Sequence, residues 1–176
     1  MCSQPSSASA DRRDTTIVDA CARVAETSFY ALAEACDAVR LAELDEALRA
    51  QVGGEADWLR VSVRFSGDCH GHLVAHVPAL VAGELIASFV GMLPDAITEE
   101  QVVDGLGEFA NMVCGAFLTE AASRLDFALT KPEVSHERAG WRPLAELTAA
   151  DGEGTAFSVA INDQPMILRV DLEVRL

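Results

Sequence analysis

Two stretches of the chain alternate apolar and polar residues with the two-residue period of a half-buried strand. Residues 58–65 place these apolar side chains on one side: Leu59, Val61, Val63 and Phe65. Residues 168–176 alternate an apolar set, Leu168, Val170, Leu172, Val174 and Leu176, with a charged set, Arg169, Asp171, Glu173 and Arg175. Each stretch needs a core on one face only, which restricts the chain to folds built around a sheet with a covered face.

Turn-forming residues beside these stretches predict two antiparallel hairpins. "SGDCHG" separates residues 58–65 from the strand-like "HLVAHV", so residues 58–77 are expected to form the first hairpin. "NDQP" separates "TAFSVAIN" from the last strand and is expected to turn the second.

Four other segments carry helical signals. Thr16 can cap a helix with apolar residues at Val18, Cys21, Ala25, Phe29, Leu32 and Cys36. A second helix, "LAELDEALRAQV", ends at Gly53, and a third starts from Pro78. Thr98 caps a fourth helix that includes residues 102–122. The expected fold is α/β in the mixed, α+β sense, a mostly antiparallel sheet of hairpins with long helices packed on one face.

The 176 residues are enough for one domain with its own core. The opening "MCSQPSSASADRRD" is rich in Ser, Ala and Pro, so residues 1–14 are expected to form a disordered arm and residues 15–176 a single domain. Residues 136–154, "HERAGWRPLAELTAADGEG", show no clear period and are expected to form an irregular excursion.

The charge balance excludes several classes of partner. Lys plus Arg is 13 and Asp plus Glu is 28, a net charge of −15, which repels nucleic-acid phosphates and anionic membranes.

The apolar run "LIASFVGMLP" is too short to span a membrane, and residues 1–16 lack the apolar core of a signal peptide, so we expect a cytoplasmic protein. The five scattered cysteines lack a CxxC spacing, which favours reduced thiols.

The fourth helix carries a polar line. Asp104, Glu108, Asn111 and Gly115 are three or four residues apart and therefore share one face. The opposite face, expected to meet the core, comprises Val103, Leu106, Ala110, Val113, Phe117 and Ala121. Gly105, Gly107 and Gly115 each cost about 1 kcal/mol relative to Ala, which indicates that something approaches the backbone closely there. From spacing alone, the line is most simply the polar face of a surface helix.

The residues around this line resemble a known family. "DGLGEFANMVCG" is similar to the D-x-x-x-E-x-x-N helix signature of the CheC/CheX-type phosphatases, with Asp104, Glu108 and Asn111 at the polar positions. The preceding "VRFSGDCHGHLVAHVP" and "LVAGELIASFVGM", and the following "FALTKPEVS", also look like the family's segments. A single signature helix looks like the CheX branch, so the resemblance implies a CheX-like fold and a homodimer.

The resemblance implies a phosphatase that hydrolyses the phospho-aspartate of a CheY-like receiver domain, in chemotaxis or another two-component pathway. The receiver brings its own Mg²⁺, so the chain needs no cofactor of its own. Asn111 is the candidate for orienting the attacking water, and Glu108 for pairing with the receiver's active-site lysine. Asp104 matches the signature without an assigned chemical step. Gly107 and Gly115 are expected to leave room for the receiver's loops.

Other readings of the sequence remain open. His70, His72 and His76 share a strand face, but Arg60 and Arg64 oppose a cation there and the hairpin alternation offers no carboxylate as a third ligand, so no metal site is expected. The rival to the phosphatase is a non-catalytic binding module that sequesters or senses a receiver through the same helix face. The outward positions of the first hairpin, or the edge of the C-terminal strand, are candidates for the homodimer contact.

Overall fold

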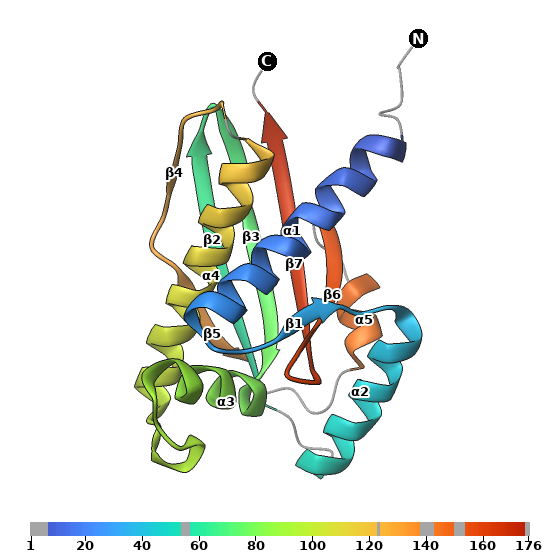
Figure 1. Ribbon diagram of the computed structural model, residues 1–176, viewed down its shortest axis with the longest axis vertical. Helices are drawn as coiled ribbons and strands as arrows, with labels where there is room; N and C mark the ends of the chain where they lie inside the picture. Colours follow the sequence, from blue (N-terminus) through green and yellow to red (C-terminus); the bar gives the residue numbers. More distant parts are fainter. Residues whose placement is uncertain (1–6, 54–56, 123, 138–142, 150–153, 175–176) are drawn as a thin grey trace.

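The computed structural model describes residues 7–53, 57–122, 124–137, 143–149 and 154–174. Figure 1 shows a sheet with helices packed against it. In chain order the elements are α1 (Ser7–Ser28), β1 (Ala33–Ala35), α2 (Ala38–Val52), β2 (Trp58–Gly67), β3 (Cys69–Pro78), α3 (Ala79–Val90), the 3-10 turn η1 (Pro94–Ala96), α4 (Glu99–Ala121), β4 (Phe127–Leu129), β5 (Glu133–Glu137), α5 (Leu144–Ala149), β6 (Thr155–Ile161) and β7 (Gln164–Val174).

The seven strands of the described residues form one sheet in the order β1-β6-β7-β3-β2-β4, and β5 also pairs with β2. All these pairings are antiparallel, and the two predicted hairpins, β2–β3 and β6–β7, are confirmed. Asn162 and Asp163 make the second turn with φ of 47° and 61°, the positive values that a two-residue hairpin turn needs. β7 lies between β6 and β3, but residues 171–174 pair with β3 alone, so the dimer contact expected at the edge of the C-terminal strand stays a prediction.

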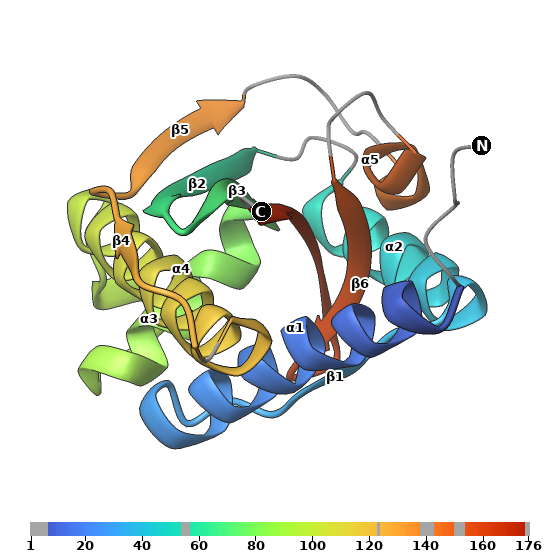
Figure 2. The same ribbon diagram turned by 90° about the horizontal axis from the view of Figure 1, so that it is seen from above.

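Helices α1, α3 and α4 cover one face of the sheet (Figure 2). The main core lies beneath them, and β2 contributes the alternating set predicted to point inward, Leu59, Val61, Val63 and Phe65. The matching residues include Phe29 directly after α1, Leu85 from α3 and Phe109 from α4. The mixed α+β fold with long helices on one face is confirmed.

A second, smaller cluster lies where α2 and α5 pack against β6 and β7. It contains Leu41, Trp58, Leu144, Leu147 and Ile167. Arg169 lies on this side of β7, where sequence predicted solvent, but it is 9% exposed and donates to the Leu147 carbonyl at 3.1 Å. The excursion predicted for 136–154 contains helix α5, while residues 138–142 and 150–153 lie outside the described residues.

Helix α1 has different limits from those predicted. It begins by Ser7, before the predicted cap at Thr16, and so includes residues 7–14 of the predicted arm, while residues 1–6 lie outside the described residues. It ends at Ser28 rather than continuing to Cys36, because Tyr30 takes a positive φ of 52° that reverses the chain into β1. Leu32, predicted on the apolar face, is 61% exposed.

The structure also bears on membrane insertion and on the cysteines. Within the described ranges, no helix combines the length and the apolar character needed to cross a membrane. Cys21, Cys69 and Cys114 are free and buried, and Cys36 is free and half-buried, whereas Cys2 lies outside the described residues.

Candidate functional site

Helix α4 begins at the predicted cap. The Thr98 hydroxyl accepts a hydrogen bond from the Gln101 N–H at 3.2 Å, and the Gln101 side-chain carbonyl accepts one from the Thr98 N–H at 2.9 Å. Glu99 and Glu100 follow in the first turn, where the helix dipole favours carboxylates. This capping box holds the start of the helix that carries the polar line.

The inward side of α4 determines which residues face outward. The Phe109 ring meets Phe29, directly after α1, edge-on with 5.0 Å between centroids, and Phe29 stacks on Phe89 of α3 at 4.3 Å. Gly105 lies against α3, where an added Cβ would come within 2.5 Å of Cγ2 of Ile86. These contacts fix the rotation of α4 about its axis.

The predicted core face of α4 is confirmed at four positions, Leu106, Ala110, Val113 and Phe117, which are all buried. Val103 is half-buried. Ala121 is exposed, so the prediction for this residue is wrong. The helix ends at Ala121, and the buried position there is taken by Ala122, which is 5% exposed.

The polar line lies on the outside of α4. Asp104 and Glu108 are exposed and Asn111 is half-exposed, and we call these three residues the α4 ridge. Within the part of the chain that the structure describes, none of the three side chains forms a hydrogen bond or an ion pair. The carboxylate of Glu108 and the carboxamide of Asn111 therefore remain available to a partner molecule.

Two glycines beside the ridge face the chain's own β4–β5 segment. Gly107 is buried, and an added Cβ would lie 3.4 Å from Cβ of Pro132 and 3.9 Å from Cγ2 of Val134. At Gly115 an added Cβ would lie 3.8 Å from Cδ1 of Leu129. The prediction that Gly107 leaves room for a partner's loops is wrong, because Pro132 already occupies that side, while Gly115 is half-exposed.

The β4–β5 segment forms a wall along one side of the ridge. Its Thr130 is held to β2, because the Thr130 N–H donates to the Arg64 carbonyl at 2.9 Å and the Thr130 hydroxyl accepts from the Arg64 N–H at 3.2 Å. At the other end, Nε2 of His136 lies 3.1 Å from a carboxylate oxygen of Glu99. Sequence reasoning missed this wall because its contacts join residues that are far apart along the chain.

The face of β3 that carries the three histidines is lined with acids from β7. Nε2 of His70 lies 2.9 Å from Glu173, and Nδ1 of His72 lies 3.9 Å from Asp171. The hairpin alternation does not reveal these carboxylates, since β7 comes from the other end of the sequence. Among the described residues, no group of three or more His, Cys, Asp or Glu side chains comes close enough to hold a metal ion.

The thiols beneath the ridge are not suited to nucleophilic chemistry. Burial raises the pKa of Cys114, on the inward side of α4, to about 12, and burial raises the pKa of Cys21 on α1 to the same value. Both thiols stay protonated at neutral pH, whereas the thiolate is the reactive form. The chemistry available at the ridge is therefore that of a carboxylate and an amide.

Comparison with known proteins places this site in a family. The family model described as chemotaxis phosphatase CheX matches residues 60–141, a range that includes the entire α4 ridge and its β4–β5 wall. No curated protein sequence matches the chain.

Solved structures share the fold. CheX from Vibrio vulnificus is 16% identical with a TM-score of 0.64, covering 92% of this chain and 96% of its own. CheX from Desulfovibrio desulfuricans is 14% identical with a TM-score of 0.60, covering 92% and 99%. The CheX–CheY–BeF3–Mg²⁺ complex from Borrelia burgdorferi is matched at 14% identity and a TM-score of 0.50, covering 78% and 98%.

At these identities the structural likeness shows the fold, and the family rests on the matched segment within it. That segment carries the signature residues Asp104, Glu108 and Asn111 on the outer side of a capped and well-packed helix. Residues 60–141 therefore match the CheX family of chemotaxis phosphatases, and the chain has a CheX-like fold around them.

Proposed function

We propose that this protein hydrolyses the phospho-aspartate of a CheY-like receiver domain. The observation that carries the proposal is the α4 ridge, where Glu108 and Asn111 face outward and have no partner among the described residues. Residues three apart on a helix have Cβ atoms about 5–6 Å from each other, so one receiver active site can contact both. The Borrelia burgdorferi CheX of similar fold forms a complex with CheY, BeF3 and Mg²⁺, which supports the choice of partner.

In the proposed reaction, Asn111 orients the attacking water. Its carboxamide has both a donor and an acceptor, so it can hold a water molecule in line with the phosphorus of a docked receiver. The water oxygen forms the new bond to phosphorus as the bond to the aspartyl oxygen breaks, which releases inorganic phosphate and the receiver's free carboxylate. Positioning and charge stabilisation account for most catalysis of phosphoryl transfer, so this chain needs no nucleophile.

Glu108 docks the receiver in this proposal. Its exposed carboxylate is the partner for the active-site lysine of the receiver, and the bound lysine then stays near the phosphoryl group. Asp104 lies one turn before Glu108 on the same outer side and extends the negative charge of the ridge. The Mg²⁺ ion belongs to the receiver, and this chain supplies no cofactor.

The homodimer and the cytoplasmic location are part of the same proposal, since both are expected of a CheX-like protein with a receiver partner. A non-catalytic module that only sequesters or senses a receiver is the rival function. The two differ in turnover, because a module binds the phosphorylated receiver through the same ridge without speeding the release of phosphate.

The deciding experiment measures phosphate release from a receiver phosphorylated by a small phosphodonor. Asn111→Ala is expected to lower the accelerated rate on the order of 100-fold, since a misplaced water loses about that factor. Binding to the BeF3-activated receiver is expected to remain, because Glu108 is intact. Glu108→Gln and Glu108→Lys are expected to weaken that binding progressively.

Glu43→Gln is the matched control for Glu108→Gln. It removes the same charge from an exposed acid of α2, which is not part of the ridge, and should leave both rate and binding unchanged. If Asn111→Ala still accelerated phosphate release from the receiver as the wild type does, Asn111 would not orient the attacking water. A wild-type protein that binds the receiver and leaves its dephosphorylation rate unchanged would identify a binding module instead.

A further inference from the structure

A cleft of about 820 Å³ opens between α1, α2, α5 and the outer edge of β6. This volume lies within the range of roughly 300–1,000 Å³ that is usual for ligand sites. Its described lining residues come from these elements and from the end of β1, and α4 contributes none of them. The cleft is therefore a surface separate from the α4 ridge.

The walls of the cleft are apolar and its rim is acidic. Val18 of α1, Leu41 of α2 and Phe157 of β6 form part of the walls. Asp19 and Glu46 are exposed at its margin, where they join Asp45, and Arg49 is the single basic residue among the described lining residues. Three carboxylates against one guanidinium favour an occupant that carries positive charge.

One side of the cleft is an unpaired edge of the sheet. β1 pairs with β6 only at Val159–Ile161, and the Cys36 N–H then donates to the Ser158 carbonyl at 2.9 Å before the chain turns into α2. Main-chain groups of a strand alternate in direction, so Ala156 directs its N–H and C=O to the same side as Ser158. β1 does not reach Ala156, and no described strand pairs with this edge there.

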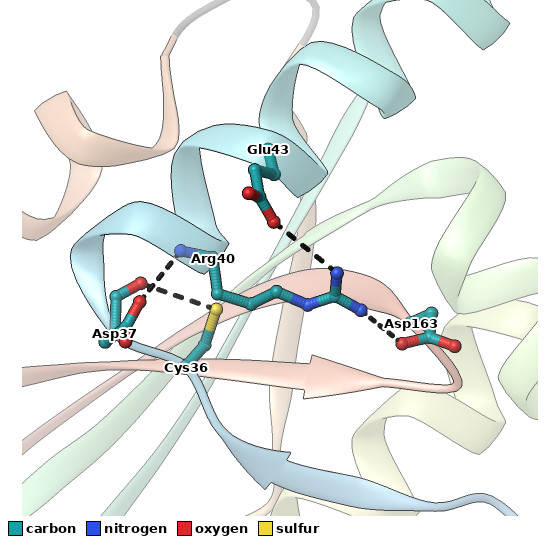
Figure 3. Close-up of polar contacts among 5 residues, drawn as sticks. All are labelled: Cys36, Asp37, Arg40, Glu43 and Asp163. Carbon is teal, nitrogen blue, oxygen red and sulfur yellow. Dashed lines mark hydrogen bonds and ion pairs between the residues drawn. The ribbon is translucent and has the colours of Figure 1, made fainter.

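Polar contacts fix one end of the cleft (Figure 3). Arg40, near the start of α2, pairs with Asp163 in the β6–β7 turn and lies 3.6 Å from Glu43. The Arg40 N–H also donates to the Asp37 carboxylate at 2.8 Å. These contacts hold the start of α2 against the hairpin turn, next to Cys36 of the cleft. The unpaired edge of β6 therefore lies in a preformed slot between α1 and α2.

We propose that this cleft binds an extended, basic peptide segment of a partner protein, which adds a short strand to β6 at Ala156. Main-chain hydrogen bonds at a sheet edge recognise extended chains, and pockets beside the edge select alternate side chains. The apolar walls suit one set of these side chains. The exposed acids Asp19 and Glu46 suit lysine or arginine in the other set, while Asp45 accepts a hydrogen bond from the Leu144 N–H at 3.2 Å and adds negative charge nearby. This site does not depend on the phosphatase proposal.

The test uses a library of randomised octapeptides, acetylated at one end and amidated at the other. Bound peptides are expected to be enriched in lysine and arginine at alternating positions, with apolar residues between them. Ala156→Pro removes the N–H on the outer edge and spares the β6–β7 ladder, since proline is tolerated on an edge strand. The best peptide should bind this variant at least ten times more weakly.

Charge is tested with a matched pair of variants. Glu46→Gln, at the margin of the cleft, should weaken binding several-fold, and added salt should reduce the difference. Glu26→Gln removes the same charge from an exposed position of α1 outside the cleft and should have no effect. Asn111→Ala should also bind the peptide normally, because the α4 ridge does not contribute to the cleft.

A second measurement protects the test if Ala156→Pro fails to fold. Two versions of the best peptide are N-methylated, one at the odd-numbered amides and one at the even-numbered amides. Both keep their charge and lose half of their main-chain donors. The version whose methylated amides face β6 should bind at least ten times more weakly to the wild type. Failure to bind any peptide, equal binding by both methylated versions, or a bound set without basic residues would each overturn the proposal. A wild-type dimer that dissociates in Ala156→Pro would assign the edge to a second copy and would also overturn it.

Discussion

The α4 ridge and the β6 cleft differ in the number of chain segments that form them. The ridge comes from one helix, and its residues Asp104, Glu108 and Asn111 are three or four positions apart. The cleft brings together residues as distant in sequence as Val18 and Ser158. A site on one element leaves a periodic pattern in the sequence, whereas a site between elements leaves none, because only the fold makes its residues neighbours.

The two surfaces also depend differently on the core. The ridge is convex, and its side chains are presented by the aromatic contacts of Phe109 beneath them. The cleft is concave, its rim includes the exposed side chains of Asp19 and Glu46, and one end is held by the surface ion pair of Arg40 and Asp163. Changes beneath the ridge should therefore cost much more free energy of unfolding than changes at the end of the cleft.

The largest effect is expected from Phe109→Ala. The Phe109 side chain is fully buried between α1 and the sheet, so its removal should lower the free energy of unfolding by about 3–5 kcal/mol. Urea unfolding measures the loss. Met112→Ala, one turn away and only half-buried, is the control and should cost about 1 kcal/mol or less. Similar losses of stability in the two variants would contradict tight packing of the Phe109 side chain beneath the α4 ridge.

Gly105→Ala is expected to have the next largest effect. Its new Cβ would lie 2.5 Å from the Ile86 side chain, and such overpacking typically costs about 1–3 kcal/mol. Gly83→Ala on α3 is the matched control, because an added Cβ there meets nothing within 4 Å and should stabilise the helix by about 0.5–1 kcal/mol. Thermal unfolding midpoints should move in opposite directions. A shift in the same direction for both variants contradicts close packing of α3 on α4.

The thiol of Cys114 makes the stability of the ridge depend on alkaline pH. Burial raises its pKa from 9.0 to about 12, so between these values the folded protein keeps a proton that the unfolded chain has lost. The stabilisation is complete below pH 9 and is lost as pH rises toward 12. Urea unfolding should show a larger loss of stability between pH 8 and pH 10.5 in the wild type than in Cys114→Ala. Equal losses of stability in the wild type and in Cys114→Ala would contradict the raised pKa of Cys114.

Thiol reactivity compares the two regions directly. Cys36 in the cleft is half-buried, and its pKa is raised by burial and then by the charge of Asp37, whereas Cys114 is fully buried under the ridge. Iodoacetamide at pH 8.5 should modify Cys36 in the folded protein and reach Cys114 only when it unfolds. Mass spectrometry of the alkylated peptides measures both sites, and equal rates of modification would show that the base of the ridge opens as readily as the cleft.

The smallest effect is expected from Asp163→Asn. This change removes the ion pair with Arg40 at the end of the cleft and keeps a residue that tolerates the positive φ of 61°. Because Asp163 is 78% exposed and Arg40 is 42% exposed, the loss in free energy of unfolding should stay below about 1 kcal/mol and decrease with added salt. A loss above about 2 kcal/mol in urea unfolding would show that the cleft is held as firmly as the ridge.

The elements that the sequence predicted are those with a local period or a local cap. The hairpin strands β2, β3, β6 and β7 alternate over seven or more residues each, and α4 has a complete capping box. The outward position of Glu108 and the inward position of Phe117 follow from helical spacing alone. The roles of Glu108 and Asn111 in catalysis remain predictions.

The elements that the sequence did not predict are short or depend on distant contacts. β1 and β4 have three residues each, too few to show an alternation, and pairing with β6 and β2 makes them strands. Leu32 falls on the helical period of α1, yet the chain leaves the helix at Ser28 and ties the Leu32 N–H to the Asn162 side chain at 2.8 Å. Arg169 follows the strand alternation, but α5 covers it and binds its guanidinium.

The sequence by itself determined the hairpins, the capped central helix and the set of residues on its outer side, because repeat distances along a strand or a helix decide which side chains share a face. Only the tertiary structure decided that Pro132 closes over Gly107, that β7 lies inside the sheet, and that an acidic cleft borders β6. These features arise where the burial of one element's apolar face brings residues from distant parts of the chain together, and no local spacing encodes such contacts.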